Sequence, residues 1–286
     1  MSKAKLFSSG YTVLPTILPP APLSALLSSF PSFFQTFPTG NYPDEWHFRP
    51  GFTYPHVTRE ICNGWKTNPL IAAVVLSPEV GRGVCGMMGW EGCRVAQDDV
   101  IWKRPNVYPN SVVPDSIYDN NTGSGDKAAK STIGFHQDSS YISYNFVPYK
   151  ASSCTLWIAL DDSGPANGGL TYALGSHAWD CYDVCGKTGA RKNRGGAGAT
   201  FMSAGAFTDP LAAALALHNA ATGEGLELGG VRLETPEVGR GGALLHLQDT
   251  WHGSAGNESE TRERRAIAVH FIEAGSRFRP AEGGGG

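Results

Sequence analysis

The sequence has little charge, and neither sign of charge dominates. Its 286 residues carry 23 Lys and Arg against 26 Asp and Glu, for a net charge of −3. The one short basic stretch, 187–194, is interpreted as a solvated loop, and the alternative is a lid that attracts an anionic substrate. Without a long basic run, we do not expect binding to nucleic acid. Hydrophobic residues at 41% and charged residues at 17% predict a folded globule.

Zinc-type CxxC pairs and apolar runs of membrane length are also missing. The six cysteines stand at positions 62, 85, 93, 154, 181 and 185. Without a secretory signal we expect reduced, partly buried thiols, with a Cys181–Cys185 disulfide or metal pair as the alternative. No apolar run approaches the roughly 18 to 20 residues that span a bilayer, so membrane insertion is not expected. The cytoplasm is the default location, because no targeting signal is evident.

Two histidines and one aspartate carry the chemical signal. In "GFHQDSSY" the chain alternates as a strand does, so His136 and Asp138, two residues apart, are expected to point to one side. A second strand around "TWHGSAGN" delivers His252. Two imidazoles and one carboxylate on one face of an octahedral iron(II) leave three positions for a co-substrate and O2. His136, Asp138 and His252 are therefore predicted to be catalytic metal ligands.

A later arginine suits the carboxylate of a bidentate co-substrate. Arg264 follows His252 closely enough for the next strand of the same sheet to bring it near the metal. Its planar, permanently charged fork matches a carboxylate better than lysine does, and Ser254 can add a hydroxyl hydrogen bond. The alternative is that Arg265 takes this role, since neighbours on a strand face opposite ways and only one of them enters the pocket.

Periodicity predicts a mainly β fold. We expect a short strand followed by a helix from about Ala21, a strand ending at Pro105, and a further helix over 209–222. Strands are expected over 152–160 and 264–274, and Asn167–Gly169 is a hairpin signal. The pattern indicates a double-stranded β-helix (jelly roll, cupin-like) with flanking N-terminal helices and one long insertion, about 178–235, between metal ligands. One domain over 1–282 and a flexible glycine tail over 283–286 are expected.

Four motifs in order resemble the phytanoyl-CoA dioxygenase (PhyH) family of Fe(II)/2-oxoglutarate-dependent oxygenases. They are "SSGYTVLPTILPPAPLSALLSSF", "GFHQDSSY", "TLWIALDDSGPANGGLTYALGSHAW" and "HGSAGNESETRERRAIAVHF", and together they cover nearly the whole chain. Two departures stand out. The family usually places a proline before Gly-Ser-His, where this chain has Ala173–Gly175, and the insertion at 178–235 matches nothing in the family pattern.

The resemblance implies a fold, a reaction and a set of residues. The reaction is hydroxylation of an unactivated C–H bond of a small organic molecule, with Fe(2+), 2-oxoglutarate and O2 consumed or bound and succinate and CO2 released. Related halogenases replace the metal-binding carboxylate by a small residue, so the aspartate favours hydroxylation. The implied iron ligands are His136, Asp138 and His252, and the implied co-substrate contacts are Arg264, Ser254, Gln137 and Trp157.

Other residues and readings stay open at this point. Tyr141, Tyr144 and Lys103 are candidates for the substrate side of the pocket. His246, six residues before His252 and thus on its strand face, is expected to be buried structure, and His177 a loop-capping residue. One alternative function is a non-catalytic metal-binding jelly roll, a pseudo-enzyme with a binding or regulatory role. Another is a cupin-like isomerase or hydrolase with zinc or manganese. No obligatory protein partner is inferred, and the substrate is not identified.

Overall fold

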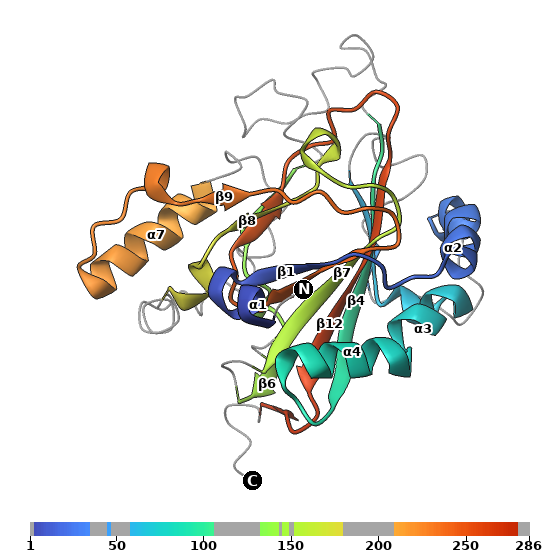
Figure 1. The fold of residues 1–286 in the computed structure, drawn as a ribbon, viewed down its shortest axis with the longest axis horizontal. Helices are drawn as coiled ribbons and strands as arrows, with labels where there is room; N and C mark the ends of the chain where they lie inside the picture. The colour runs from blue at the N-terminus through green and yellow to red at the C-terminus, as the bar shows by residue number, and fades with distance from the viewer. Residues whose placement is uncertain are drawn as a thin grey trace.

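The computed structural model describes residues 3–34, 45–46, 58–105, 132–142, 145–148, 152–179 and 209–279. Within these ranges two antiparallel sheets form the body of the protein (Figure 1). The larger has the strand order β1-β10-β7-β12-β4-β3-β2 and the smaller has the order β5-β11-β8-β9. A separate pair joins β13 to β6. The predicted jelly-roll architecture is confirmed.

The strands of the larger sheet span β1 Tyr11–Leu14, β2 Glu45–Trp46, β3 Arg59–Cys62, β4 Cys93–Lys103, β7 Ser153–Ala159, β10 Ala243–Leu247 and β12 Arg264–Glu273. Those of the smaller sheet span β5 Ile133–His136, β8 Leu170–Ala173, β9 Leu233–Glu234 and β11 His252–Ser254. The outlying pair is β6 Phe146–Val147 and β13 Arg277–Phe278.

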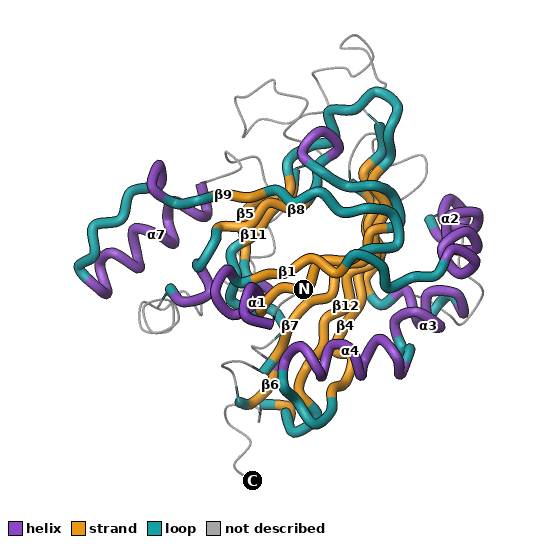
Figure 2. The backbone as a smooth tube through the Cα atoms, in the orientation of Figure 1, coloured by secondary structure: helices purple, strands orange, loops and turns teal. Residues whose placement is uncertain are grey.

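Helices lie outside the two sheets (Figure 2). They are α1 Lys3–Ser9, α2 Pro20–Phe33, α3 Pro69–Val75, α4 Pro78–Met88 and α7 Asp209–Thr222. Short 3-10 turns occur at η1 Gly64–Lys66, η4 Asp138–Ser140, η6 Pro165–Asn167, η7 Ser176–Ala178 and η9 Leu228–Gly230. In Figure 1, α2, α3 and α4 lie along one side of the larger sheet, whereas α7 lies beyond the smaller sheet.

The break between α3 and α4 follows from local sequence. By length and composition alone, the stretch Pro69–Met88 is apolar enough to cross a membrane. The Ser77 hydroxyl accepts a hydrogen bond from Val80 N and caps α4, with a proline at the first helical position, so the stretch is two helices. Ile71 and Val84 pack into the core, and 22% of the apolar window within this stretch is buried.

Alternation along the strands separates two faces of the larger sheet. Ile267 on β12 is aligned with Ile158 and Val100 on the neighbouring strands, and all three join the cluster that packs under the helices. Its neighbour Ala268 is aligned with Trp157 and Asp99 on the opposite face. That inner face looks toward the smaller sheet, where Tyr172 belongs to the same cluster as Trp157 and Ala268. Polar side chains on this inner face are thus buried between the sheets.

Two predictions concern segments that connect strands, namely the turn at Asn167–Gly169 and the insertion at 178–235. Asn167–Gly169 is not a hairpin turn, because it links β7 of the larger sheet to β8 of the smaller one. Gly168 does have the positive φ, 74°, that the turn signal predicts. Of the insertion 178–235, residues 180–208 lie outside the described residues, while β9 pairs with β8 and extends the smaller sheet. The basic stretch 187–194 and the tail 283–286 also lie outside the described residues.

Candidate metal centre and co-substrate pocket

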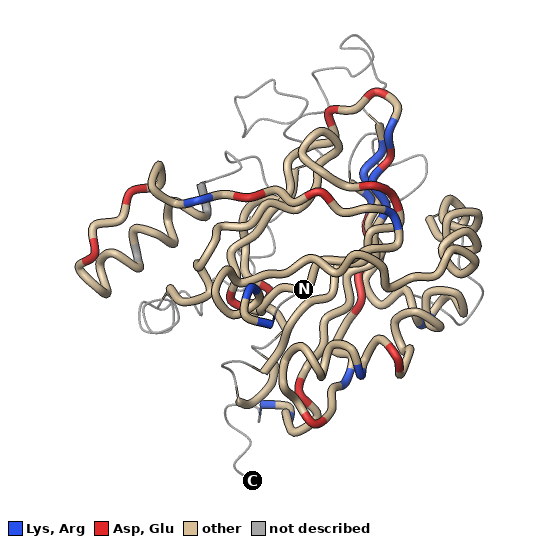
Figure 3. The backbone as a smooth tube through the Cα atoms, in the orientation of Figure 1, with Lys and Arg blue, Asp and Glu red and all other residues tan. Residues whose placement is uncertain are grey.

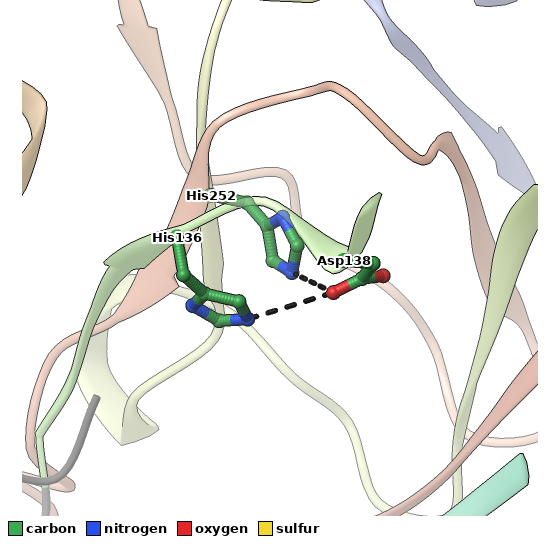
Figure 4. Close-up of side chains that lie close together, drawn as sticks. All are labelled: His136, Asp138 and His252. Atoms are coloured by element: carbon green, nitrogen blue, oxygen red, sulfur yellow. Dashed lines mark ion pairs between the residues drawn. The ribbon is translucent and has the colours of Figure 1, made fainter. Parts of the chain in front are cut away.

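Three predicted ligands meet in the smaller sheet. His136 ends β5 and His252 begins β11, and their Cα atoms are aligned across the two strands. Asp138 is not on the strand as predicted, because the strand ends at His136 and Asp138 opens the 3-10 turn η4. Its Oδ1 lies 3.6 Å from His136 Nε2 and 3.5 Å from His252 Nε2 (Figure 4). The three ligand atoms all lie within 4.8 Å of one another.

Hydrogen bonds fix both imidazoles in the form that binds a metal. His136 Nδ1 lies 2.9 Å from the carbonyl of Gly134, and His252 Nδ1 lies 2.9 Å from that of Thr250. A carbonyl only accepts, so each Nδ1 carries the proton and each Nε2 lone pair faces Asp138. Burial lowers the pKa of His136 to about 3 and that of His252 to about 4, which keeps both rings neutral. Two cis ligands of an octahedral metal, each about 2.1 Å from it, lie about 3 Å apart, so the donor set fits one ion.

The Asp138 carboxylate is buried but stays charged. Its Oδ1 accepts a hydrogen bond of 2.7 Å from the Tyr141 hydroxyl. Its Oδ2 accepts one of 2.9 Å from His246 Nε2 and another from the Thr155 hydroxyl. Burial alone would raise the pKa of Asp138, but the nearby His252 and the hydrogen bond from His246 hold it well below its usual range. The site therefore offers one negative charge to a cation.

Arg264 reaches the pocket from the opposite sheet. The expectation of the next strand of the same sheet is wrong, since β12 belongs to the larger sheet and β11 to the smaller one. Arg264 is fully buried, and it donates from Nε to Gly168 O at 3.0 Å and from Nη2 to Ser254 Oγ at 3.3 Å. Arg265 faces the other way, where its guanidinium pairs with Asp161 at 2.7 Å. Of the two arginines, Arg264 is the one that enters the interior.

Two buried donors beside this site lack an acceptor among the described residues. They are Nη1 of Arg264 and Nε1 of Trp157. The Arg264 guanidinium carbon lies 5.2 Å from the centre of the Trp157 ring, so both donors belong to one wall. Buried donors normally have a partner, and such a pair is expected beside an anionic ligand. The chemistry of this wall fits a carboxylate of 2-oxoglutarate.

Lys103 lies next to Arg264 and is also fully buried. The two residues are aligned across β4 and β12. Lys103 Nζ donates to Ser254 O at 3.1 Å and to Ala255 O at 2.5 Å. Burial and the charge of Arg264 lower the pKa of Lys103 well below its usual value. Figure 3 shows basic positions gathered at this end of the larger sheet.

Of the remaining predicted residues, the structure describes Gln137, Tyr141 and His177. Gln137 donates from Nε2 to Asp249 O at 2.5 Å, so its side chain holds the loop before His252. Tyr141 is in the site, with its ring centroid 6.5 Å from that of His136. Tyr144 lies outside the described residues. His177 Nε2 lies 2.9 Å from the carbonyl of Phe7, which belongs to helix α1 and not to a loop.

His246 is buried as expected, at 1% exposure, but it does not share a strand with His252. It lies on β10 of the larger sheet and approaches Asp138 from there. Thr155 and His270 also contact this carboxylate region and were missed from the sequence. Their spacing along the strands could have identified them, because residues an even number of positions apart point to the same side of a strand. Thr155 is two residues from Trp157, and His270 is an even number of residues from Arg264.

A second group of side chains could also hold a metal ion. Glu60, Cys62 and Asp99 also bring ligand atoms within 4.8 Å of one another. Asp99 is already bound, because it accepts from His270 Nε2 at 2.8 Å and from Gln97 Nε2 at 2.9 Å. The described cysteines 62, 85, 93 and 154 are not joined in disulfides. Cysteines 181 and 185 lie outside the described residues.

A jelly roll with two histidines and one carboxylate at a common point, and a buried arginine bonded to Ser254 on the strand of His252, defines a non-haem iron oxygenase type of site. The sequence matches the family described as "Phytanoyl-CoA dioxygenase (PhyH)" over residues 8–266. The chain therefore belongs to the phytanoyl-CoA dioxygenase family, as its motifs suggested. A search of curated proteins found no match.

Solved structures of similar fold agree with this assignment. The α-ketoglutarate-dependent epimerase SnoN of nogalamycin biosynthesis is 16% identical, with a TM-score of 0.62, over 97% of this chain and 84% of that one. The carbocyclase SnoK of the same pathway is 18% identical, with a TM-score of 0.61, over 100% and 89%. EctD from S. alaskensis, solved with 2-oxoglutarate and 5-hydroxyectoine, is 15% identical, with a TM-score of 0.63, over 97% and 77%. The predicted cofactors, iron and 2-oxoglutarate, agree with the family and with the donor set.

Proposed function

We propose that this protein is an iron(II)- and 2-oxoglutarate-dependent dioxygenase that hydroxylates an unactivated C–H bond of a small organic molecule. The observation that carries the proposal is the convergence of His136 Nε2, His252 Nε2 and Asp138 Oδ1 on one point. All three are in the protonation state that a metal needs, because both rings keep their proton on Nδ1 and the carboxylate is ionised.

His136, Asp138 and His252 would hold the iron, and the chain's other residues would prepare the pocket. When bound, iron(II) and 2-oxoglutarate supply the activation of O2, with 2-oxoglutarate converted to succinate and CO2. His252 and Asp138 are buried between the sheets and the His136 side chain is 15% exposed, so the protein would limit the access of water to the reacting groups. Tyr141 keeps its hydroxyl on Asp138 Oδ1, so it would limit the space on the substrate side of the metal. Tyr144 remains a candidate for the same side.

Arg264 would bind the distal carboxylate of 2-oxoglutarate. Its Nε is used by Gly168 O, which leaves Nη1 and the Ser254 hydroxyl to face the ligand. Trp157 would donate from Nε1 on the same wall. Lys103 donates hydrogen bonds to the carbonyls of Ser254 and Ala255, so it would hold this loop in place beside the carboxylate.

The presence of an aspartate, Asp138, at the metal-binding position favours hydroxylation over halogenation. Asp138 fills the place that related halogenases leave to chloride, and three hydrogen bonds hold it there. The similar structures include an epimerase, a carbocyclase and a complex with 5-hydroxyectoine, so the fold hosts several reaction outcomes. The substrate would be a small molecule.

The test is the conversion of 2-oxoglutarate to succinate in the absence of substrate. Wild type supplied with iron(II) and O2 should release succinate slowly, and His136→Ala and Asp138→Ala should release none. His177→Ala, which removes the hydrogen bond to Phe7 O in helix α1, is the matched control and should behave as wild type. Undiminished turnover in both ligand variants would reject the assignment. Metal binding without succinate from wild type would favour the non-catalytic jelly roll.

A further inference from the structure

The two oxygens of Asp138 have different surroundings. Oδ1 faces the Nε2 atoms of His136 and His252 and accepts one hydrogen bond, from the Tyr141 hydroxyl. Oδ2 points to the larger sheet, where it accepts hydrogen bonds from His246 Nε2 and from the Thr155 hydroxyl. Two donors on one oxygen leave it little capacity for a metal, so the carboxylate is held with a defined direction.

The contacts behind Oδ2 come from three neighbouring strands in register. His246 on β10, Thr155 on β7 and His270 on β12 have aligned Cα atoms across the larger sheet. Such a row is rigid, because each strand is hydrogen-bonded to the next. The donors that reach Oδ2 are therefore fixed by the larger sheet, while the histidines beside Oδ1 are fixed by the smaller one.

The hydrogen-bond pattern settles which group donates along this row. Thr155 has one hydroxyl hydrogen, and it goes to Asp138 Oδ2 because an ionised carboxylate only accepts. Thr155 Oγ1 then accepts from His270 Nδ1 at 2.8 Å. His270 Nε2 also donates, to Asp99 Oδ2 at 2.8 Å, so His270 carries a proton on both ring nitrogens and is a cation. Burial alone would lower the pKa of His270, but Asp99 and Asp138 raise it. On the other side, the Tyr172 hydroxyl lies 3.0 Å from His246 Nδ1 and donates to it, which leaves the His246 hydrogen on Nε2 for Asp138.

We propose that Thr155 and His246 are positioning residues that hold Asp138 Oδ2 away from the metal, so that Asp138 binds it through Oδ1 alone. His270 and Asp99 support Thr155 from behind, and Tyr172 supports His246. This inference rests on the proposed iron site. A carboxylate that binds through both oxygens would occupy an additional coordination position. Single-oxygen binding keeps three positions for the two co-substrate atoms and O2.

The test compares Thr155→Val with Thr155→Ser in the full chain. Valine has nearly the shape of threonine without the hydroxyl, and serine restores the hydroxyl. Purified metal-free protein is titrated with Co²⁺ in the absence of 2-oxoglutarate, and the visible d–d spectrum reports the affinity and the coordination number together. We expect Thr155→Val to bind Co²⁺ about 10- to 100-fold more weakly, with a changed spectrum, and Thr155→Ser to recover most of both.

A second pair of variants keeps the test decisive if Thr155→Val does not fold. His246→Gln retains an N–H donor near the position of Nε2, whereas His246→Leu removes it. The affinity for Co²⁺ should fall more for leucine than for glutamine. Equal affinities and spectra within both pairs would overturn the positioning role. If wild type itself fails to bind Co²⁺, it is the proposed iron site that is wrong.

Discussion

Replacing Arg264 by lysine should weaken the binding of 2-oxoglutarate without removing the positive charge. Arg264 is fully buried, and its guanidinium is held by Gly168 O and Ser254 Oγ, with Nη1 left for the ligand. A lysine in its place presents a point charge and loses the planar two-donor geometry.

The size of the effect follows from the contacts that are lost. A hydrogen bond to a charged group contributes about 1.5–3 kcal/mol. Loss of one such bond to the co-substrate carboxylate therefore raises the dissociation constant of 2-oxoglutarate about 10- to 150-fold. The affinity is measured by isothermal titration of Mn²⁺-loaded protein without O2, so that no turnover occurs.

Arg265→Lys is the matched control, because the neighbouring arginine pairs with Asp161 and Glu263 on the other face of the strand. It should leave the 2-oxoglutarate affinity unchanged. Both variants are first compared with wild type by thermal unfolding. Wild-type affinity in Arg264→Lys, or an equal loss in Arg265→Lys, would refute the assignment of Arg264.

Two further changes test the pocket wall and the buried carboxyls. Gly168→Ala should destabilise the protein by about 1–3 kcal/mol more than Gly175→Ala in urea unfolding. Both glycines have positive φ, but only at Gly168 would the added Cβ meet a backbone oxygen, that of Ala255 at 2.7 Å. Burial raises the pKa of Asp98 from 3.8 to about 7. The folded state thus binds this proton more tightly, and stability is lost as pH rises from about 4 through 7. The stability of Asp98→Asn relative to wild type should therefore rise between pH 5 and pH 8, by up to about 3 kcal/mol; equal pH dependence of both proteins would contradict this.

Strands and ligand identities were predictable because their signals are local. The alternation in 93–105 and 264–274 yields β4 and β12, and the apolar stretch 209–222 is the helix α7. The two histidines of the site were found from their motifs, and the structure brings both to one point.

Sheet membership was not predictable, because it depends on pairing between distant segments. Arg264 follows His252 in the chain, yet it reaches the pocket from the facing sheet. The turn at Gly168 carries a hairpin signal but crosses between sheets, since neither glycine nor asparagine encodes which strand comes next. The contacts of Thr155 and His270 with the Asp138 region arise only when three strands align.

The most direct test of the iron site is an anaerobic titration of the metal-free protein with iron(II) followed by 2-oxoglutarate. Chelation of 2-oxoglutarate to iron held by His136, Asp138 and His252 should produce a weak visible charge-transfer band in wild type and none in Asp138→Ala. A wild-type protein that binds neither component and stays colourless would contradict the account.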